Sequence, residues 1–176
     1  MKAVLFTVLL AAILVIFNNV SYSQFVVGKN TGSLSIGVGG GGLTGTGAIP
    51  ISAEYNFWNY EKNIQAGVFA SYASTSEDFF FGKWKYTYII IAAQGNYHFT
   101  PGEKFDPFAG LSIGYDIGSS SVTYNNGYQN FGGSASVGGI FFSAQAGFNY
   151  WFSEKFAAQV RVGYFPYASA GITMAL

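Results

Sequence analysis

The sequence predicts an all-β chain that folds as an eight-stranded antiparallel transmembrane β-barrel. Three observations predict this class: a hairpin cassette that repeats three times, a shortage of charged residues, and apolar runs that alternate with period two. In the cassette, a strand closes with Tyr-x-Phe and a short polar turn ends in Glu-Lys. Aromatic rings at strand ends are typical of a sheet that leaves hydrocarbon and meets water. The copies span Tyr55–Lys62, Tyr97–Lys104 and Tyr150–Lys155.

The composition indicates that part of the surface faces lipid. Charged residues make up 9% of the 176 residues and aromatic residues 19%, whereas a soluble domain carries about 25% charged residues. The net charge is zero and no Lys/Arg run is present, so nucleic acid is not an expected partner. The chain has no cysteine and one histidine, which argues against a disulfide, a thiolate metal site or a zinc site. We therefore expect no cofactor.

The first residues have the pattern of a secretory signal. Lys2 gives a positive start, Ala3–Phe17 is apolar, and Ser21-Tyr22-Ser23 places small residues where a signal peptidase cleaves. The alternative is a retained anchor helix, but the apolar run is shorter than the roughly 20 residues that span a bilayer. The sequence predicts a cleavable signal peptide over residues 1–23 and a barrel domain over residues 24–176.

The barrel domain divides into eight units of about 19 residues, and a tilted membrane strand uses roughly 9 to 11 of them. Alternation sets an apolar face against a face of Gly, Ser, Gln and Asn. The large side chains of eight strands would overfill a narrow barrel, so we expect the apolar face to point outward. The predicted strands are Ser33–Gly39, Ile49–Phe57, Asn63–Tyr72, Tyr86–Phe99, Pro107–Ile117, Ile140–Phe152, Ala157–Tyr164 and Ser169–Leu176.

The connections alternate in length, which gives the barrel two different ends. The Glu-Lys turns are short, whereas Gly40–Ala48, Ser74–Lys85 and Gly118–Val137 are long; the last connection, Phe165–Tyr167, is tight. Short turns and both mature termini are therefore expected in the periplasm, and long loops outside. A further hairpin within Gly118–Gly138 would give ten strands; alternatively, this segment extends the fifth and sixth strands above the membrane.

Aromatic residues at the strand ends predict a girdle at each membrane interface. The outer ring would contain Tyr72, Tyr164 and Tyr167. The periplasmic ring would contain Tyr55, Phe57, Tyr97, Phe99, Tyr150 and Phe152.

From Gly32 to Leu176 the chain resembles the small outer membrane β-barrels of the OmpA/OmpX type, that is, porin-family barrel domains. The resemblance rests on the Tyr-x-Phe hairpins, on the stretch PFAGLSIGY at Pro107–Tyr115, and on the terminal strand with Ile172, Met174 and Leu176. It implies an integral outer membrane protein surrounded by lipid and lipopolysaccharide, whose terminal strand is the signal read by the barrel-assembly machinery. Leu176 stands where most members have Phe. The Gln after the small-residue cleavage site resembles signal peptides of the Bacteroidetes.

The inward face carries the candidate polar site. Glu54 and Arg161 fall on this face, with Asp116 expected to join them nearer the outer end. An unpaired charge in a narrow lumen is costly, so these groups are expected to pair. A polar plug is favoured over a gated ion path because an eight-stranded interior is filled by its own side chains. The neutral members of the network would be Gln65, Gln94, Gln145 and Gln159.

His98 is the one candidate for acid–base chemistry. It lies between Tyr97 and Phe99 at a periplasmic strand end, with no Ser or carboxylate pattern of a triad around it. A general base depends on positioned partners. The pattern favours an inward-facing structural histidine, and we do not expect an enzyme.

The connection after the third strand carries four large aromatics: Phe79, Phe80, Phe81 and Trp84. They would bind a partner, or lie in the outer leaflet while Lys83 and Lys85 meet lipopolysaccharide phosphates; both alternatives stay open. The Gly118–Gly133 segment is read as a flexible loop in preference to a recognition surface. The predicted role is structural or one of surface contact. The alternatives are a narrow solute channel or a lipid-modifying enzyme.

Overall fold

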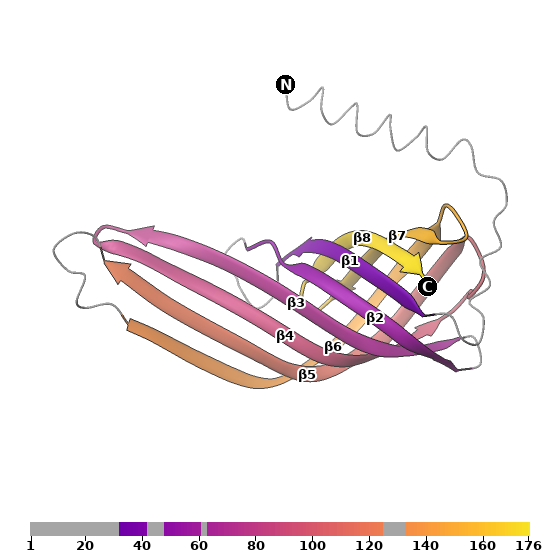
Figure 1. Ribbon diagram of the computed structural model, residues 1–176, viewed down its shortest axis with the longest axis horizontal. Helices are drawn as coiled ribbons and strands as arrows, with labels where there is room; N and C mark the ends of the chain where they lie inside the picture. The colour runs from indigo at the N-terminus through magenta and orange to yellow at the C-terminus, as the bar shows by residue number, and fades with distance from the viewer. Residues whose placement is uncertain (1–31, 42–47, 61–62, 125–132) are drawn as a thin grey trace, which may run out of the picture.

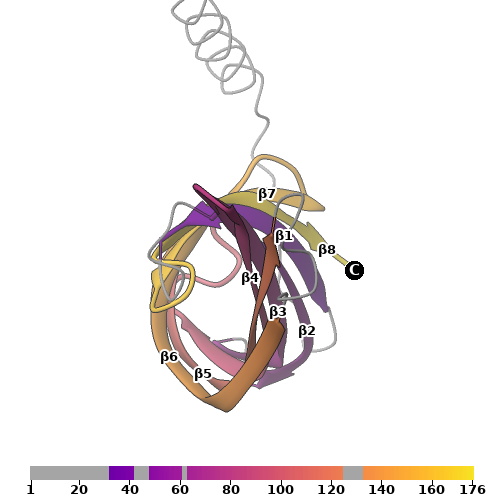
Figure 2. The same cartoon turned by 90° about the vertical axis from the view of Figure 1, so that its left-hand side faces the viewer.

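The computed structural model describes residues 32–41, 48–60, 63–124 and 133–176, and these form a closed antiparallel barrel of eight strands (Figures 1 and 2). Consecutive strands are neighbours throughout, and the predicted fold class is confirmed. The predicted signal peptide lies outside the described residues. The strands are β1 (Ser33–Gly40), β2 (Ile51–Tyr60), β3 (Ile64–Phe79), β4 (Gly82–His98), β5 (Phe105–Tyr124), β6 (Gly133–Trp151), β7 (Phe156–Gly163) and β8 (Ala168–Ala175).

The barrel closes because β1 pairs on both sides. Leu34 lies opposite Tyr55 of β2 and opposite Met174 of β8. Closure satisfies the backbone groups that hydrocarbon cannot solvate, since every strand of the barrel has two neighbours. In the part of the chain that the structure describes, no helix is long and apolar enough to cross a membrane.

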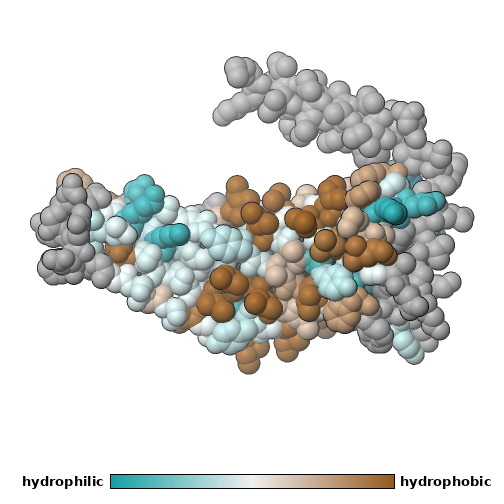
Figure 3. All heavy atoms as spheres, viewed as in Figure 1, coloured by the Kyte–Doolittle hydropathy of each residue, from teal (hydrophilic) through white to brown (hydrophobic). Residues whose placement is uncertain are grey.

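The apolar face points outward, as the alternation predicts. On β5, Leu111, Ile113 and Tyr115 are each more than half exposed, whereas the intervening Ser112 is buried in the lumen. In Figure 3 the hydrophobic residues gather around the barrel, while the far end of the long strands is pale to teal. An exterior that is apolar only over the barrel is what a lipid-facing belt requires.

The eight strands fall into two length classes. β3 to β6 have 16 to 20 residues, whereas the other four have 8 to 10. The long strands therefore continue beyond the barrel as a four-stranded sheet (Figure 1). We call this part the projecting sheet; it comprises Ser74–Phe79, Gly82–Tyr88, Gly118–Tyr124 and Gly133–Gly138.

The projecting sheet corrects two predictions. The sequence predicts long loops over Ser74–Lys85 and Gly118–Val137. Most residues of these segments are instead paired in strands, with Thr75 opposite Tyr86 and Ser119 opposite Ser136. The second segment extends β5 and β6, so the ten-strand alternative is wrong for the described residues; residues 125–132 lie outside them. Apolar alternation ends where both faces of a sheet meet water, which is why the predicted strands stop too early.

The interior also differs from the expected set of small and polar side chains. Above the polar groups lies a cluster of buried apolar residues, here called the apolar layer. Its large members come from β3, β4, β6 and the tight β7–β8 connection, so it crosses the lumen. The polar lower lumen and this layer together fill the barrel. The apolar layer consists of Ala48, Phe69, Ala73, Ile90, Ala92, Phe141 and Phe165.

Candidate functional site

An ion pair between Arg161 of β7 and Glu54 of β2 lies at the centre of the lumen. The Arg161 Nη1 atom donates to Glu54 Oε1 at 2.6 Å, and Nη2 donates to Gln145 Oε1 at 2.7 Å. The two charged residues are only 2% and 3% exposed. Charge-assisted hydrogen bonds of this kind fix side chains firmly, so the pair ties opposite strands together across the barrel.

Glutamines extend the ion pair to neighbouring strands. Gln94 Nε2 donates to the second carboxylate oxygen of Glu54 at 3.1 Å and to Asn56 Oδ1 at 2.9 Å. Gln145 Nε2 donates to Asn96 Oδ1 at 2.8 Å, and the Ser112 hydroxyl donates to Gln145 Oε1 at 2.6 Å. The network thus joins β2, β4, β5, β6 and β7.

Three other residues that the sequence assigned to the network lie apart from the ion pair. Gln65 donates to the Ser33 hydroxyl at 3.3 Å and Gln159 to the Ser35 hydroxyl at 3.5 Å, both nearer the periplasmic end. Asp116 makes no hydrogen bond to the network; it lines an open pocket beside Gly139 on the other side of the apolar layer. The expectation that Asp116 joins Glu54 and Arg161 is wrong because Ile90 and Phe141 fill the space between the two levels.

The apolar layer covers the polar network from the outer side. The Arg161 guanidinium lies 4.3 Å from the centroid of the Phe69 ring, in cation–π geometry. Phe69, Ile90 and Phe165 have no exposed surface. Desolvated guanidinium–ring contacts are worth about 2 kcal/mol or more, so the layer and the network stabilise each other.

His98 has a carboxylate partner that the sequence analysis missed. Its Nδ1 lies 2.6 Å from Asp106 Oδ2, and both side chains are buried at the periplasmic end. His98 lies opposite Phe108 across the β4–β5 hairpin, and Asp106 is the diagonal neighbour on the same face. The register of the β4–β5 hairpin would have predicted that Asp106 lies beside His98. His98 Nε2 has no hydrogen-bond partner among the described residues.

The predicted girdle residues differ in exposure. Of the ring predicted for the periplasmic side, Tyr55, Phe57, Tyr97 and Phe99 are 44% to 59% exposed, and Tyr150 and Phe152 are half-buried. Of the predicted outer ring, Tyr72, Tyr164 and Tyr167 are exposed, and the last two rings meet edge to face. In the terminal strand Ile172 and Leu176 are exposed and Met174 is half-buried.

The four loop aromatics separate into two groups. Phe80 is 90% exposed at the β3–β4 turn and packs edge to face on Phe81. Phe79 and Trp84 belong to strands and not to a loop, which corrects the prediction; their rings pack on one another and Phe79 also meets Tyr124. Phe80 and Phe81 are exposed at the tip, outside the paired strands.

The two faces of the projecting sheet differ in chemistry. The inner face of β4 continues the lumen wall beyond buried Ile90. It carries Trp84, Tyr86 and Tyr88. Lys83 and Lys85 lie on the opposite, outer face, where a pocket of about 380 Å³ is also lined by Ser and Thr side chains. Lys83 lies 3.8 Å from Asp78. The described residues contain no cluster of His, Asp or Glu that could hold a metal ion.

Comparison with known proteins identifies the fold. No protein-family model and no curated protein matches the sequence. Among solved structures, the attachment invasion locus protein Ail of Yersinia pestis, in complex with the heparin analogue sucrose octasulfate, matches with a TM-score of 0.56 at 13% identity, over 84% of this chain and 96% of that one. The N-terminal β-barrel domain of Pseudomonas aeruginosa OprF matches with a TM-score of 0.55 at 14% identity, over 85% and 99%. Neisserial surface protein A matches with a TM-score of 0.50 at 13% identity, over 82% and 94%.

These matches and the geometry define the class of protein. A closed eight-stranded barrel with an apolar belt outside and a filled lumen is the architecture of the small outer membrane barrels. The chain has this fold, which is that of the OmpA/OmpX type of barrel.

Proposed function

We propose that this protein is a non-enzymatic outer membrane barrel that stabilises the membrane and makes surface contacts through its projecting sheet. The observation that carries the proposal is the contrast in strand length: β3 to β6 extend past the apolar belt, while β1, β2, β7 and β8 end near it. A barrel that served only as a membrane plug would have no need of four extended strands.

The outer face of the projecting sheet has the chemistry to meet lipopolysaccharide. Lys85 precedes the exposed belt residue Ile89 by four positions on the same face, about 13 Å along the strand. This distance from the belt supports a contact of the ammonium group with headgroup phosphates. The Ail structure contains a polyanionic sulfated sugar, and in this chain we assign polyanion contact to the outer face.

The lumen supports a plug and not a channel. The Arg161–Glu54 pair and the apolar layer cross the same narrow interior. Planar-bilayer recording of the purified barrel should therefore give no steady conductance. A conductance that changes with Glu54→Gln or Arg161→Gln would establish the channel instead.

The contact role is tested by shortening the projecting sheet. One variant joins Ser74 to Thr87 and Ser119 to Ser136 through Asn-Gly turns, at positions that pair across each hairpin. Its barrel should still show a heat-modifiable shift on gels, because the belt and lumen are intact. Adherence of expressing cells to epithelial monolayers should fall to the level of cells without the protein. Unchanged adherence at equal surface expression would refute the contact role.

A lipid-modifying activity is tested separately. Lipid A mass profiles should be the same with and without expression, because His98 Nε2 meets no nucleophile among the described residues. A profile that changes on expression and reverts in His98→Ala would identify an enzyme.

A further inference from the structure

A row of aromatic rings follows one strand on the inner face of the projecting sheet. Trp84, Tyr86 and Tyr88 are two residues apart on β4, so their side chains leave the same face about 6.6 Å apart. The Trp84 and Tyr86 ring centroids are 6.2 Å apart and their planes differ by only 13°. The Trp84 and Tyr86 ring planes are therefore nearly parallel along the strand.

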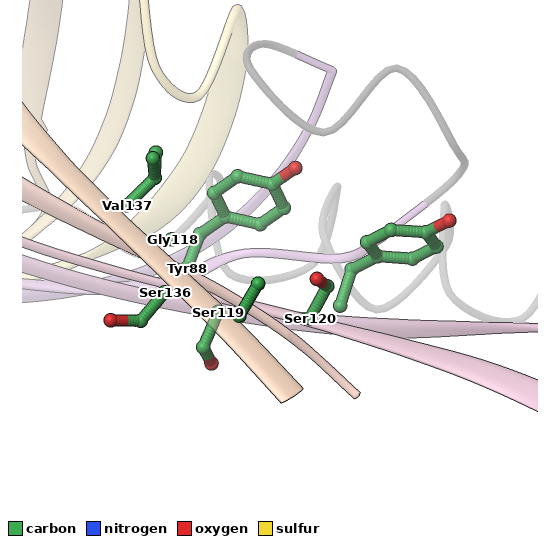
Figure 4. A pocket seen from close by; sticks show the side chains of 8 residues that line it. Tyr88, Gly118, Ser119, Ser120, Ser136 and Val137 are labelled. Carbon is green, nitrogen blue, oxygen red and sulfur yellow. The ribbon is translucent and has the colours of Figure 1, made fainter. Parts of the chain in front are cut away.

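The neighbouring strands place small residues beside these rings. Gly118 lies opposite Tyr88, Ser120 lies opposite Tyr86, and Ala135 follows on β6. The result is an open pocket of about 310 Å³ lined by Tyr86 and Tyr88, and Figure 4 shows the Tyr88 ring on the same side of the sheet as Val137. Pockets that bind small ligands begin at about 300 Å³.

The charges on this face are negative. Asp116 shares the inner face of β5 with Ser112, lines the adjoining pocket of about 360 Å³, and has no hydrogen-bond or ion-pair partner among the described residues. Both lysines of the described projecting sheet are on the outer face. The inner face therefore disfavours anionic ligands, while Asp116, Tyr86 and Tyr88 offer polar atoms to a ligand rich in hydroxyl groups.

We propose that the inner face binds a chain of neutral sugars. The apolar C–H face of a sugar ring stacks on the electron-rich face of an aromatic ring, and its hydroxyl groups can donate to Asp116. A cationic group would instead favour rings that enclose it from several sides, which the nearly parallel Trp84 and Tyr86 planes do not do. A peptide would add to an open sheet edge and not to this face. The inference rests on the proposed contact role and names its ligand class.

Binding can be measured with the mature chain folded in a polyoxyethylene detergent, because an alkyl maltoside would carry a competing sugar. The probes are maltohexaose, cellohexaose and chitohexaose, followed by tryptophan fluorescence and calorimetry. At least one should give a saturable fluorescence change. Trp84 is one of three tryptophans, and the other two lie at periplasmic strand ends. Trp84→Phe should therefore abolish the fluorescence change while calorimetry still detects binding.

The ring row is tested by truncation. Tyr88→Ala should weaken binding at least tenfold, because it removes a stacking surface and leaves the barrel untouched. The matched control is Thr87→Ala, the adjacent position on the other face, which should bind as the wild type does. A heat-modifiable gel shift verifies that each variant is folded.

Three results would overturn the proposal. They are the absence of saturable binding to all three sugars at millimolar concentration, binding that is unchanged in Tyr88→Ala, and preferential binding of a heparin hexasaccharide that is lost in Tyr88→Ala. The proposal would also be wrong if a peptide displaced the sugar probes from the wild type but not from Tyr88→Ala, because the ligand would then be a peptide. The contact role is tested independently of sugar binding. It is supported if shortening the projecting sheet abolishes adherence, and it is refuted if adherence is unchanged.

Discussion

The four strands of the projecting sheet, β3 to β6, also form half of the eight-stranded barrel, yet the two regions follow different rules. On the outer face of β5, Leu111, Ile113 and Tyr115 cover the barrel, and Ser119, Ser121 and Thr123 continue the same face beyond it. Lipid accepts only apolar side chains at this face, whereas water accepts hydroxyl groups. One strand thus changes its chemistry at the membrane boundary while its hydrogen-bonded register continues.

The two regions also differ in how their edges are protected. Within the barrel every strand has two neighbours. In the projecting sheet, β3 has no β2 partner and β6 has no β7 partner. Open edges are tolerated in water and not in lipid. We therefore expect stability to reside in the barrel and surface contacts in the projecting sheet.

The largest effect is expected from breaking the lumen ion pair. Arg161→Gln leaves Glu54 as a buried carboxylate without its cation, which costs about 3–5 kcal/mol of unfolding free energy. Chemical unfolding of the barrel in lipid vesicles measures this loss. The double variant Glu54→Gln/Arg161→Gln should lose less than the sum of the single changes because no unpaired charge remains. A loss below about 1 kcal/mol for Arg161→Gln would show that the lumen does not carry the stability.

The next effect separates the two regions on a single strand face. Ile113→Arg puts a charge in the middle of the lipid belt and should destabilise the barrel by about 2–4 kcal/mol. Ser121→Arg makes the matched change on the same face of β5 in the projecting sheet, and should stay within about 0.5 kcal/mol. Both are measured by vesicle unfolding. Equal losses would mean that the membrane boundary is not between these positions.

A smaller loss is expected at the periplasmic end of the barrel. Asp106→Ala leaves the buried His98 Nδ1 without its partner, which costs about 1–3 kcal/mol. Thermal loss of the heat-modifiable form would be compared between wild type and variant. An unchanged transition would mean that water replaces the carboxylate there.

The smallest effect on stability is expected in the projecting sheet. Tyr88→Ala removes a half-buried ring above the apolar layer and should change the unfolding free energy by no more than about 0.5 kcal/mol. The same variant should lose at least tenfold in sugar affinity. A large loss of stability would instead make the ring row a structural extension of the barrel.

The sequence was a good guide wherever lipid imposes alternation. The outward position of Ile113 and the inward positions of Glu54 and Arg161 follow from period-two patterning alone, because a strand turns successive side chains to opposite faces. The three Tyr-x-Phe cassettes also located the short turns between β2 and β3, β4 and β5, and β6 and β7. The strand count followed from the length of the predicted barrel domain, divided into units of about 19 residues.

The sequence by itself determined the class of fold, the face of each strand and the two ends of the barrel, because lipid tolerates a single arrangement of polar and apolar side chains. Only the tertiary structure decided where the long strands end, because hydroxyl-rich strands in water lack an apolar period. It also paired His98 with Asp106 and separated Asp116 from Arg161 by an apolar layer. These relations depend on register between strands and on the level at which side chains meet in the lumen, which no single strand encodes.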